Sequence, residues 1–427
     1  METGKKETLT RLFGGRVLSM DGPLTVTEDE VWVRGTRICY LGPTPEVLPD
    51  FDREIDLRGG LLMPGFKNAH AHSAMTFCRS LADDLPLQPW LFEHIFPLEA
   101  KLTPERVCAF TRLAILEYLA GGVTAAFDMY YHRPAGAACA AEQGFRYVLC
   151  GMNGTPEQVE REYTELNALH PLVSLIPGIH AEYTTSLADM RIVSELVHRH
   201  RAPFFTHISE TEREQAECLE RHGMTPTELF DSLGLFDYGG GGYHCCHLSE
   251  HDIEIFRDRG LFVVSCPASN AKLASGIAPL RRYADAGIGL ALGTDGPSSN
   301  NALDMFREMY LAAVLQKLLC RDAAALDAET VLRAATVGSA RAMGLTDCDG
   351  IAPGKQADLI VIDLDRPAMR PIVNIPQNLV YAGGRDCVRL TMIAGRVLYA
   401  DGEFFLPDSP EKIYAEAQRE LRAMLAE

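Results

Sequence analysis

The sequence predicts an α/β fold: a (β/α)8 TIM barrel with a small composite β-sandwich domain formed by both termini. Between residues 61 and 354, short apolar runs alternate with longer helical segments. The runs are apolar at nearly every position, which indicates a parallel sheet covered by helices. About eight such runs are present, the number that a barrel needs. The regions that flank this stretch carry β signals instead.

The N-terminal region is predicted to be β-rich because short apolar runs are separated by turn signals such as Asp21-Gly22 and Arg34-Gly35. The C-terminal region resembles it, with a strand over residues 357–363, a hairpin over 388–399 and an amphipathic helix over 410–426. We therefore predict that residues 1–60 and 355–427 form one composite β domain with a C-terminal helix, and that residues 61–354 form the barrel.

Within the barrel, the expected strands are residues 62–66, 123–127, 147–149, 172–178, 204–206, 262–265 and 288–292, with one more near 243–246. The expected helices between them include residues 104–119, 156–169, 187–198 and 211–221.

The charge of the chain restricts its partners. Its 427 residues contain 40 Lys+Arg and 58 Asp+Glu, a net charge of −18. This disfavours nucleic acid and anionic membranes as partners, because both need basic patches, and suits an enzyme acting on a small molecule.

The sequence also predicts where the protein is located. No run approaches the roughly 18 apolar residues of a membrane span, the N-terminus has no apolar leader, and the 12 Cys contain no CxxC pair. A cytoplasmic protein is predicted.

Three polar clusters follow predicted strands. His70 and His72 are two residues apart, so on a strand both rings project to one side. His207 ends an apolar run and Glu210 follows it, and Asp295 lies just after the run that ends near residue 292. Taken singly, each has a structural explanation as a loop histidine, a helix-starting carboxylate or a turn aspartate.

Taken together, the clusters predict a metal site. The catalytic mouth of a barrel lies at the carboxyl ends of its strands, where all of these residues are expected. Three imidazoles and one carboxylate suit Zn²⁺ or Fe²⁺ and leave a position for water. The predicted ligands of one divalent ion, with Zn²⁺ favoured and Fe²⁺ possible, are His70, His72, His207 and Asp295.

At this point the chain resembles the amidohydrolase superfamily, in its purine-nucleoside and cytosine deaminase and chlorohydrolase branch. The matching segments are residues 63–72 (MPGFKNAHAH), 206–211 (THISET), 244–248 (HCCHL), 293–296 (GTDG) and 352–361 (APGKQADLIV). A closer likeness, to the 5′-methylthioadenosine/S-adenosylhomocysteine deaminases, rests on residues 82–87, 90–91, 97–99 and 298–301.

The resemblance implies roles for further residues. Glu210 and His244 would be the acid–base pair, with Asp295 also passing a proton. The implied substrate contacts are Trp90, Glu99, His180 and Ser299. The structural alternatives are a core or lid aromatic for Trp90, a solvated helix start for Glu99 and a helix cap for Ser299. The resemblance also implies a homo-oligomer, and the absence of a lysine near His180 favours a mononuclear site.

The implied reaction is hydrolytic deamination of an adenine nucleoside at C6, with release of ammonia after attack by metal-activated water. Relatives of this kind hold the homocysteine carboxylate with arginines after the third barrel strand. The corresponding stretch, residues 150–155, contains no arginine. The sequence therefore favours 5′-methylthioadenosine, 5′-deoxyadenosine or adenosine over S-adenosylhomocysteine. The alternatives are hydrolysis of guanine, cytosine, a pterin or a triazine on the same scaffold and, remotely, a non-catalytic binding protein.

Overall fold

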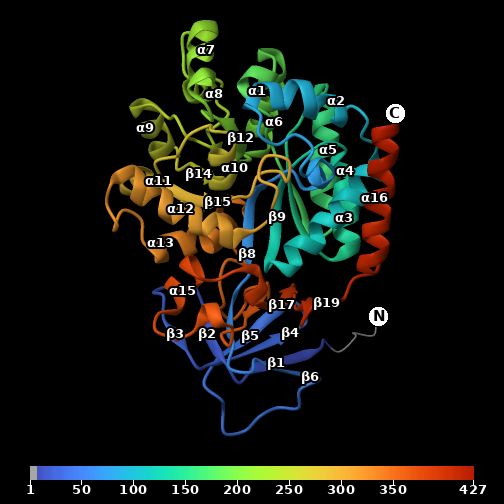
Figure 1. The fold of residues 1–427 in the computed structure, drawn as a ribbon, viewed down its shortest axis with the longest axis vertical. Helices are drawn as coiled ribbons and strands as arrows, with labels where there is room; N and C mark the ends of the chain where they lie inside the picture. Colours follow the sequence, from blue (N-terminus) through green and yellow to red (C-terminus); the bar gives the residue numbers. More distant parts are fainter. Residues whose placement is uncertain (1–6) are drawn as a thin grey trace.

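The computed structural model describes residues 7–427, and its chain forms two parts (Figure 1). A barrel surrounded by helices occupies the upper part of the view. Below it lies a β-rich part built from the blue N-terminal and red C-terminal segments. This arrangement confirms the predicted fold class, including the contribution of both termini to the smaller part.

The barrel consists of two four-stranded parallel sheets, with the strand orders β11-β10-β9-β8 and β12-β13-β14-β15. Isolated parallel bridges join the two sheets, between Gly178 and Phe205 on one side and between Ala71 and Asp295 on the other. The second bridge places Asp295, a predicted metal ligand, at the junction between the two sheets, which we call the barrel seam. The strands are β8 (Phe66–Ala71), β9 (Val123–Met129), β10 (Arg146–Cys150), β11 (Val173–Ile176), β12 (Phe204–Ile208), β13 (Gly240–His244), β14 (Phe262–Ser265) and β15 (Gly289–Leu292).

Helices follow the barrel strands, as the sequence predicts. The larger ones are α3 (Pro104–Ala120), α4 (Arg133–Gln143), α5 (Pro156–Leu169), α6 (Leu187–His200), α7 (Glu212–His222), α9 (Glu250–Asp258) and α12 (Met305–Cys320). The shorter ones are α8 (Pro226–Ser232), α10 (Pro267–Lys272), α11 (Leu280–Asp285), α13 (Ala328–Arg333) and α14 (Ser339–Ala342). A later helix, α15 (Ile375–Tyr381), packs against α12 and α13. Between β8 and α3, three short helical turns cover one side of the barrel mouth: α1 (Leu87–Pro89), η2 (Trp90–Ile95) and α2 (Phe96–Glu99).

The smaller part is a sandwich of two sheets. One has the strand order β5-β4-β1-β6 and the other β19-β18-β17-β16-β7-β2-β3. Val31 and Val33 from the first sheet share a buried apolar core with Leu62 and Val361 from the second. The strands are β1 (Leu9–Phe13), β2 (Arg16–Leu18), β3 (Val26–Thr27), β4 (Glu30–Arg34), β5 (Arg37–Gly42), β6 (Arg53–Asp56), β7 (Leu61–Pro64), β16 (Leu359–Ile362), β17 (Val388–Ile393), β18 (Arg396–Ala400) and β19 (Glu403–Phe404).

One predicted strand is wrong. Residues 62–66 were expected to form the first barrel strand, but β7 pairs with β16 and β2 and so belongs to the sandwich. The first barrel strand starts at Phe66 and already contains His70. Gly65 separates the two strands, and a Cβ on it would lie 2.2 Å from Thr124 Cγ2. The close packing therefore requires glycine here, and the first barrel strand begins a few residues later than expected.

The C-terminal helix α16 (Pro410–Ala426) returns from the sandwich and runs along α3 on the outside of the barrel (Figure 1). Lys101 Nζ donates to the Met424 carbonyl oxygen at 2.8 Å and fastens the end of the helix. Among the helices of residues 7–427, none combines the length and the apolar character needed to cross a lipid bilayer.

A buried ionic cluster joins the bottom of the barrel to the sandwich. Arg146 at the start of β10 donates from Nε and Nη2 to both carboxylate oxygens of Asp358, at 2.7 and 2.9 Å. Lys67 Nζ lies 3.6 Å from the same carboxylate, and all three side chains are buried. Burial alone would raise the pKa of Asp358, but the two cations lower it to about 2. The carboxylate is therefore the charge that permits two cations to be buried here.

We expect Asp358→Asn to destabilise the protein strongly, because it leaves both buried cations without a counter-charge. Breaking such a pair costs about 3–5 kcal/mol. Chemical or thermal unfolding would measure the loss. The matched control is Asp401→Asn, which removes an exposed pair with Arg58 and should cost at most about 1 kcal/mol. Equal effects of the two variants would contradict the importance of the buried cluster.

Candidate metal centre and active site

The polar side chains predicted from the sequence converge at the carboxyl ends of the barrel strands. His70 lies within β8, and His72 follows that strand directly. His207 lies in β12 and His244 ends β13. Asp295 follows β15, and Ala71 forms a bridge to it across the barrel seam. Strands far apart in the sequence thus bring these groups to one place.

Four of these residues form a compact group. His70, His72, His207 and Asp295 each offer a ligand atom, and these atoms all lie within 4.8 Å of one another. Asp295 Oδ1 is 3.5 Å from His70 Nε2 and 3.2 Å from His72 Nε2. The Nε2 atoms of His72 and His207 are 3.4 Å apart. All four residues are buried, so the structure brings together the complete predicted ligand set.

The hydrogen bonds that His72 and His207 form through Nδ1, on the side of each ring away from the ligand group, show that this group fits a cation. His72 Nδ1 donates to the Met129 carbonyl oxygen at 2.5 Å, and His207 Nδ1 donates to the His180 carbonyl oxygen at 2.7 Å. A neutral imidazole with a proton on Nδ1 has a lone pair on Nε2. The two Nε2 atoms therefore face each other at 3.4 Å. Burial alone would lower the pKa of His72, but the neighbouring Asp295 raises it to about 9, so this contact needs either a proton or a metal ion between its acceptor atoms.

His70 supports the same conclusion. Both of its ring nitrogens are buried and have no protein hydrogen-bond partner. Burial lowers the pKa of His70 to about 3, so the ring is neutral. Buried polar atoms without partners are rare in proteins and call for a ligand. The ring stacks on Tyr243 with a centroid distance of 3.8 Å, which fixes its orientation.

The second carboxylate oxygen of Asp295 is held by two hydroxyl groups. Ser269 Oγ donates to Oδ2 at 2.5 Å and Ser299 Oγ at 2.8 Å. Ser299 is buried and is not among the residues that line the cavity. The structure therefore places this predicted substrate contact behind the metal ligand, where it orients the carboxylate. Ser269 has the same position, and the sequence analysis missed it.

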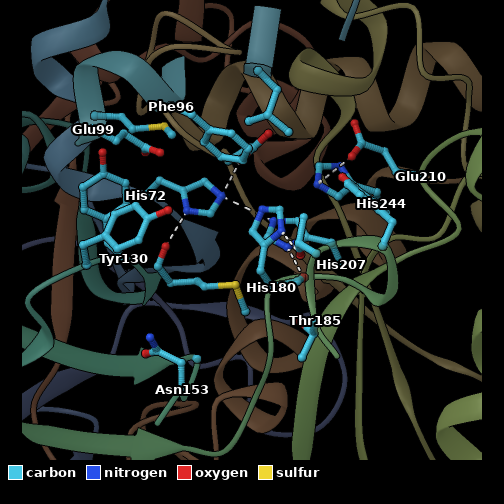
Figure 2. Close-up of a pocket in the computed structure, with 18 of the residues that line it drawn as sticks. His72, Phe96, Glu99, Tyr130, Asn153, His180, Thr185, His207, Glu210 and His244 are labelled. Carbon is cyan, nitrogen blue, oxygen red and sulfur yellow. Dashed lines mark hydrogen bonds and ion pairs between the residues drawn. The ribbon is translucent and has the colours of Figure 1, made fainter. Parts of the chain in front are cut away.

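Glu210 and His244 lie beside the ligand group and face each other. His244 Nε2 is 3.9 Å from Glu210 Oε2, while His244 Nδ1 donates to Asn270 Oδ1 at 2.7 Å. Ser275 Oγ donates to Glu210 Oε1 at 2.8 Å. Both side chains are thus fixed from behind, with their functional atoms directed toward the cavity (Figure 2).

A cavity of about 310 Å³ opens in front of the ligand group. His72, His207, Glu210, His244 and Asp295 form its inner end. This volume is at the lower end of the range of small-molecule sites. Three of the predicted substrate contacts line the wall: Trp90, Glu99 and His180.

Glu99 is the unusual group in that wall. Its carboxyl group is buried on the side of the cavity where Tyr130 also lies (Figure 2). Burial raises the pKa of Glu99 to about 7, although Tyr130 acts in the opposite direction. A buried carboxylate is costly unless a ligand provides hydrogen-bond donors. Glu99 is therefore suited to accept hydrogen bonds from hydroxyl groups.

Backbone strain also gathers at this site. His244 and Asp295 both have positive φ values, of 69° and 59°. Such conformations cost about 1–3 kcal/mol each in residues other than glycine and are concentrated at functional sites. Here they turn each side chain into the cavity as its strand ends.

The sequence analysis missed one charged residue in the wall. Arg133, at the start of α4, lines the cavity together with Gly151, Met152 and Asn153. The stretch 150–155 itself contains no arginine, as the sequence shows. Arg133 brings a guanidinium group to this wall from outside that stretch. The signal that could have found it is the one used for His207 and Asp295, a polar residue just after a barrel strand.

Comparison with known proteins places this geometry in a family. Residues 61–398 match the amidohydrolase family. The chain belongs to this family. The resemblance stated from the sequence motifs is thereby confirmed, and the family together with the three-histidine, one-aspartate group indicates a divalent metal ion.

Individual proteins are similar to this chain over almost its whole length. A 5-methylthioadenosine/S-adenosylhomocysteine deaminase of Thermococcus onnurineus is 42% identical over 393 residues, which cover 90% of this chain and 92% of that protein. An adenosine deaminase from Xanthomonas campestris, crystallised with bound zinc, is 35% identical, with a TM-score of 0.92 and coverage of 98% and 99%. The zinc-complexed atrazine chlorohydrolase of Arthrobacter aurescens, 22% identical with a TM-score of 0.88 and coverage of 96% and 100%, shares the fold.

We expect the purified protein to carry about one divalent ion per chain, as three histidines and one aspartate predict. His207→Ala should remove it, and metal should then no longer raise the melting temperature. A ligand that binds only the folded state stabilises it by about 2.7 kcal/mol at 100 times Kd. Elemental analysis and thermal unfolding would measure both effects. His251→Ala, on exposed α9, is the control, and an ion retained by His207→Ala would contradict the ligand assignment.

Proposed function

We propose that this protein is a metal-dependent hydrolytic deaminase of adenine nucleosides, which releases ammonia from C6 of the purine. One observation carries the proposal. The Glu210–His244 pair faces the ligand group at the inner end of a cavity, and Trp90 and Glu99 line the wall of that cavity. The acid–base groups and the proposed ribose acceptor Glu99 thus lie in the same cavity. The names of similar proteins, which include two deaminases of adenine nucleosides, support the proposed activity.

His70, His72, His207 and Asp295 would hold the ion, and their nitrogen and oxygen donors favour Zn²⁺. A divalent ion in such a site supplies Lewis acidity and makes water nucleophilic at neutral pH. The zinc bound to the Xanthomonas campestris adenosine deaminase supports the same choice.

In the proposed reaction, Glu210 donates a proton to the ring nitrogen next to C6, so that negative charge does not accumulate there. His244 hydrogen-bonds the incoming oxygen and fixes its position. Asp295 accepts one proton of the attacking water and passes it to the departing amine. When the C6–N bond breaks, the proton left on the C6 hydroxyl returns to Glu210, which restores the acid. These transfers require groups within hydrogen-bond reach of the substrate. Ser275 and Asn270 restrain Glu210 and His244, which limits the movement needed before reaction.

The remaining wall is suited to a nucleoside. Trp90 offers a flat apolar surface, while Glu99 would accept hydrogen bonds from the ribose hydroxyls. His180 lies beside His207, with ring centroids 4.7 Å apart, and its Nδ1 forms a hydrogen bond with Thr184. Its other ring nitrogen is therefore available to the ligand. The cytoplasmic location, the homo-oligomer and the absence of nucleic-acid and membrane partners stay predictions.

The proposal is tested by measuring ammonia release from the metal-loaded protein across a panel of substrates. The panel contains adenosine, 5′-deoxyadenosine, 5′-methylthioadenosine, free adenine, guanine, cytosine, a pterin and a triazine. We expect the adenine nucleosides to have the highest kcat/KM. A higher value for a free base, the pterin or the triazine would replace this proposal with one of the other hydrolase activities.

Glu210→Gln should retain the metal and lose turnover by about 100-fold or more, the usual contribution of a general acid. Elemental analysis and the rate of deamination would be compared in one preparation. Glu217→Gln is the matched control, because Glu217 lies on the exposed side of α7, where it pairs with Arg213. A Glu210→Gln protein with the native rate would exclude the proton-donor role.

The raised pKa of Glu99 predicts a pH dependence of substrate binding. Above about pH 7 the carboxylate is charged and accepts strong hydrogen bonds, and below it the group becomes neutral. KM for adenosine should therefore rise as the pH falls through 7. Glu99→Gln should have a high KM with a flatter pH profile. Free adenine has no ribose, so the substitution should hardly affect its KM, and an equal effect on both ligands would contradict the ribose contact.

A further inference from the structure

The first turn of α7 contains a buried glutamate that takes no direct part in the proposed reaction. Glu214 is only 5% exposed, and both oxygens of its carboxylate accept hydrogen bonds from main-chain nitrogens. Oε1 accepts from Ser209 at 2.9 Å, and Oε2 accepts from Glu210 at 2.8 Å. Hydrogen bonds from main-chain N–H groups to a carboxylate are charge-assisted and strong. Glu214 therefore fixes the backbone of the proposed proton donor.

This contact differs from an ordinary helix cap. Thr211 is the N-cap of α7 and Glu214 is the third residue of the helix, a spacing typical of a capping box. In a capping box the glutamate accepts from the N-cap nitrogen, as Glu228 accepts from Thr225 at 2.8 Å in α8. The Glu214 carboxylate instead binds the nitrogens of the two residues before the N-cap. Its side chain thus stabilises the loop that precedes the helix.

That loop needs a restraint because its backbone is strained. Ser209 has a positive φ of 51°, a conformation that residues other than glycine adopt at a cost. Burial raises the pKa of Glu214 to about 7, although the two main-chain N–H groups act in the opposite direction. The strain and the burial of a carboxylate are both unfavourable by themselves. Together they set the direction in which Glu210 leaves strand β12.

The residue after Glu214 connects this loop to the one that carries His244. Gln215 Nε2 donates to Ser209 Oγ and to the His247 carbonyl oxygen, both at 2.8 Å. The His247 main-chain nitrogen donates in turn to the Ser209 carbonyl oxygen at 2.9 Å. The first turn of α7 is therefore bonded to both loops from which the acid–base pair extends.

Glu210 also borders a second space, into which its side chain could turn. Besides the large cavity, it lines a cavity of about 260 Å³ beside α7, together with Arg213 and Arg221. The guanidinium groups of these arginines attract a carboxylate. A Glu210 carboxyl group that turned toward them would move away from His244 and from the inner end of the large cavity. Fixing the Glu210 main chain opposes this movement.

We propose that Glu214 is a positioning residue for the deamination: by holding the main chain of Ser209 and Glu210, it directs the Glu210 carboxyl group toward His244 and the substrate. The inference rests on the proposed function, in which Glu210 donates a proton. Glu214 is not among the residues that line the large cavity, so it acts through Glu210. Because proton donation stabilises the transition state, the loss of Glu214 should lower kcat and leave KM nearly unchanged.

The first test replaces one acceptor oxygen of this carboxylate by an amide donor. In Glu214→Gln, one of the two main-chain N–H groups loses its partner. The metal-loaded variant should have a kcat for adenosine lower by about tenfold or more, with native KM and metal content. Glu228→Gln is the matched control, because Glu228 has the same spacing to its N-cap and does not line the large cavity. It should keep the native kcat.

A double variant separates positioning from a merely structural role. If Glu214 acts through Glu210, adding Glu214→Gln to Glu210→Gln should lower kcat by less than about twofold further, because the proton donor is already absent. A structural defect would lower kcat by the same factor in both backgrounds. Glu214→Asp keeps both acceptor oxygens on a side chain one carbon shorter and should recover part of the rate. If Glu214→Gln does not fold, Glu214→Asp takes its place in both comparisons.

The outcomes distinguish this inference from the proposed function. A native kcat in Glu214→Gln, or equal losses in the two backgrounds, would overturn the positioning role and leave the deaminase assignment intact. A native protein that deaminates no adenine nucleoside would overturn the proposed function. If that protein hydrolyses another member of the substrate panel, the same variants measured on that substrate decide the role of Glu214. If it hydrolyses none, both proposals fail.

Discussion

The facing Nε2 atoms of His72 and His207 are the constraint on which the rest of the structure depends. Each ring donates its Nδ1 proton to a main-chain carbonyl oxygen, so that the two Nε2 atoms face each other 3.4 Å apart. Asp295 Oδ1 lies 3.2 Å from one of them. Acceptor atoms at these separations repel in a buried site unless a proton or a metal ion lies between them. The fold must therefore hold several strand ends in place against that repulsion, and it does so with a continuous buried network of hydrogen bonds.

That network connects the two strands at the barrel seam. Asn68 Nδ2 donates to Thr294 Oγ1 at 2.7 Å, and its Oδ1 accepts from the Thr294 main-chain nitrogen at 2.9 Å. Asn300 Nδ2 donates to the Thr294 carbonyl oxygen at 2.6 Å and to Glu308 Oε1 at 2.7 Å. Glu308 Oε2 in turn accepts from the Ala268 nitrogen at 3.0 Å. Burial raises the pKa of Glu308 to about 8, so burying this group is costly. In return, Glu308 ties together the loops that carry Ser269 and Ser299, the two serines that hold the Asp295 carboxylate.

The sequence identifies the four residues that the structure brings together as a candidate ligand group, because their signal is local: an apolar strand ends, and a histidine or aspartate follows. Prediction from the sequence fails where the role of a residue depends on which loops lie next to each other in the fold. Ser299 lies one turn from Asp295 and binds its carboxylate, yet sequence spacing alone could not separate this role from a substrate contact. Arg133 lies outside the segment in which an arginine was sought, and only the pairing of β9 with β10 brings it beside Asn153. The strand over residues 62–66 was misassigned because Gly65 is required by packing against Thr124, a contact that local patterns do not show.

The two ends of the cavity obey different physical requirements. At the inner end, catalysis needs groups held within a fraction of an ångström, and Asp295, Glu210 and His244 are each held by a buried polar side chain. At the outer end, the wall is formed by side chains that begin a few residues after the neighbouring strands β9 and β10. Because adjacent barrel strands open onto the same mouth, side chains from two loops can lie beside one position in the cavity, as Arg133 lies beside Asn153. Substrate preference is therefore best inferred from the residues that line the cavity, and not from a single segment of the sequence.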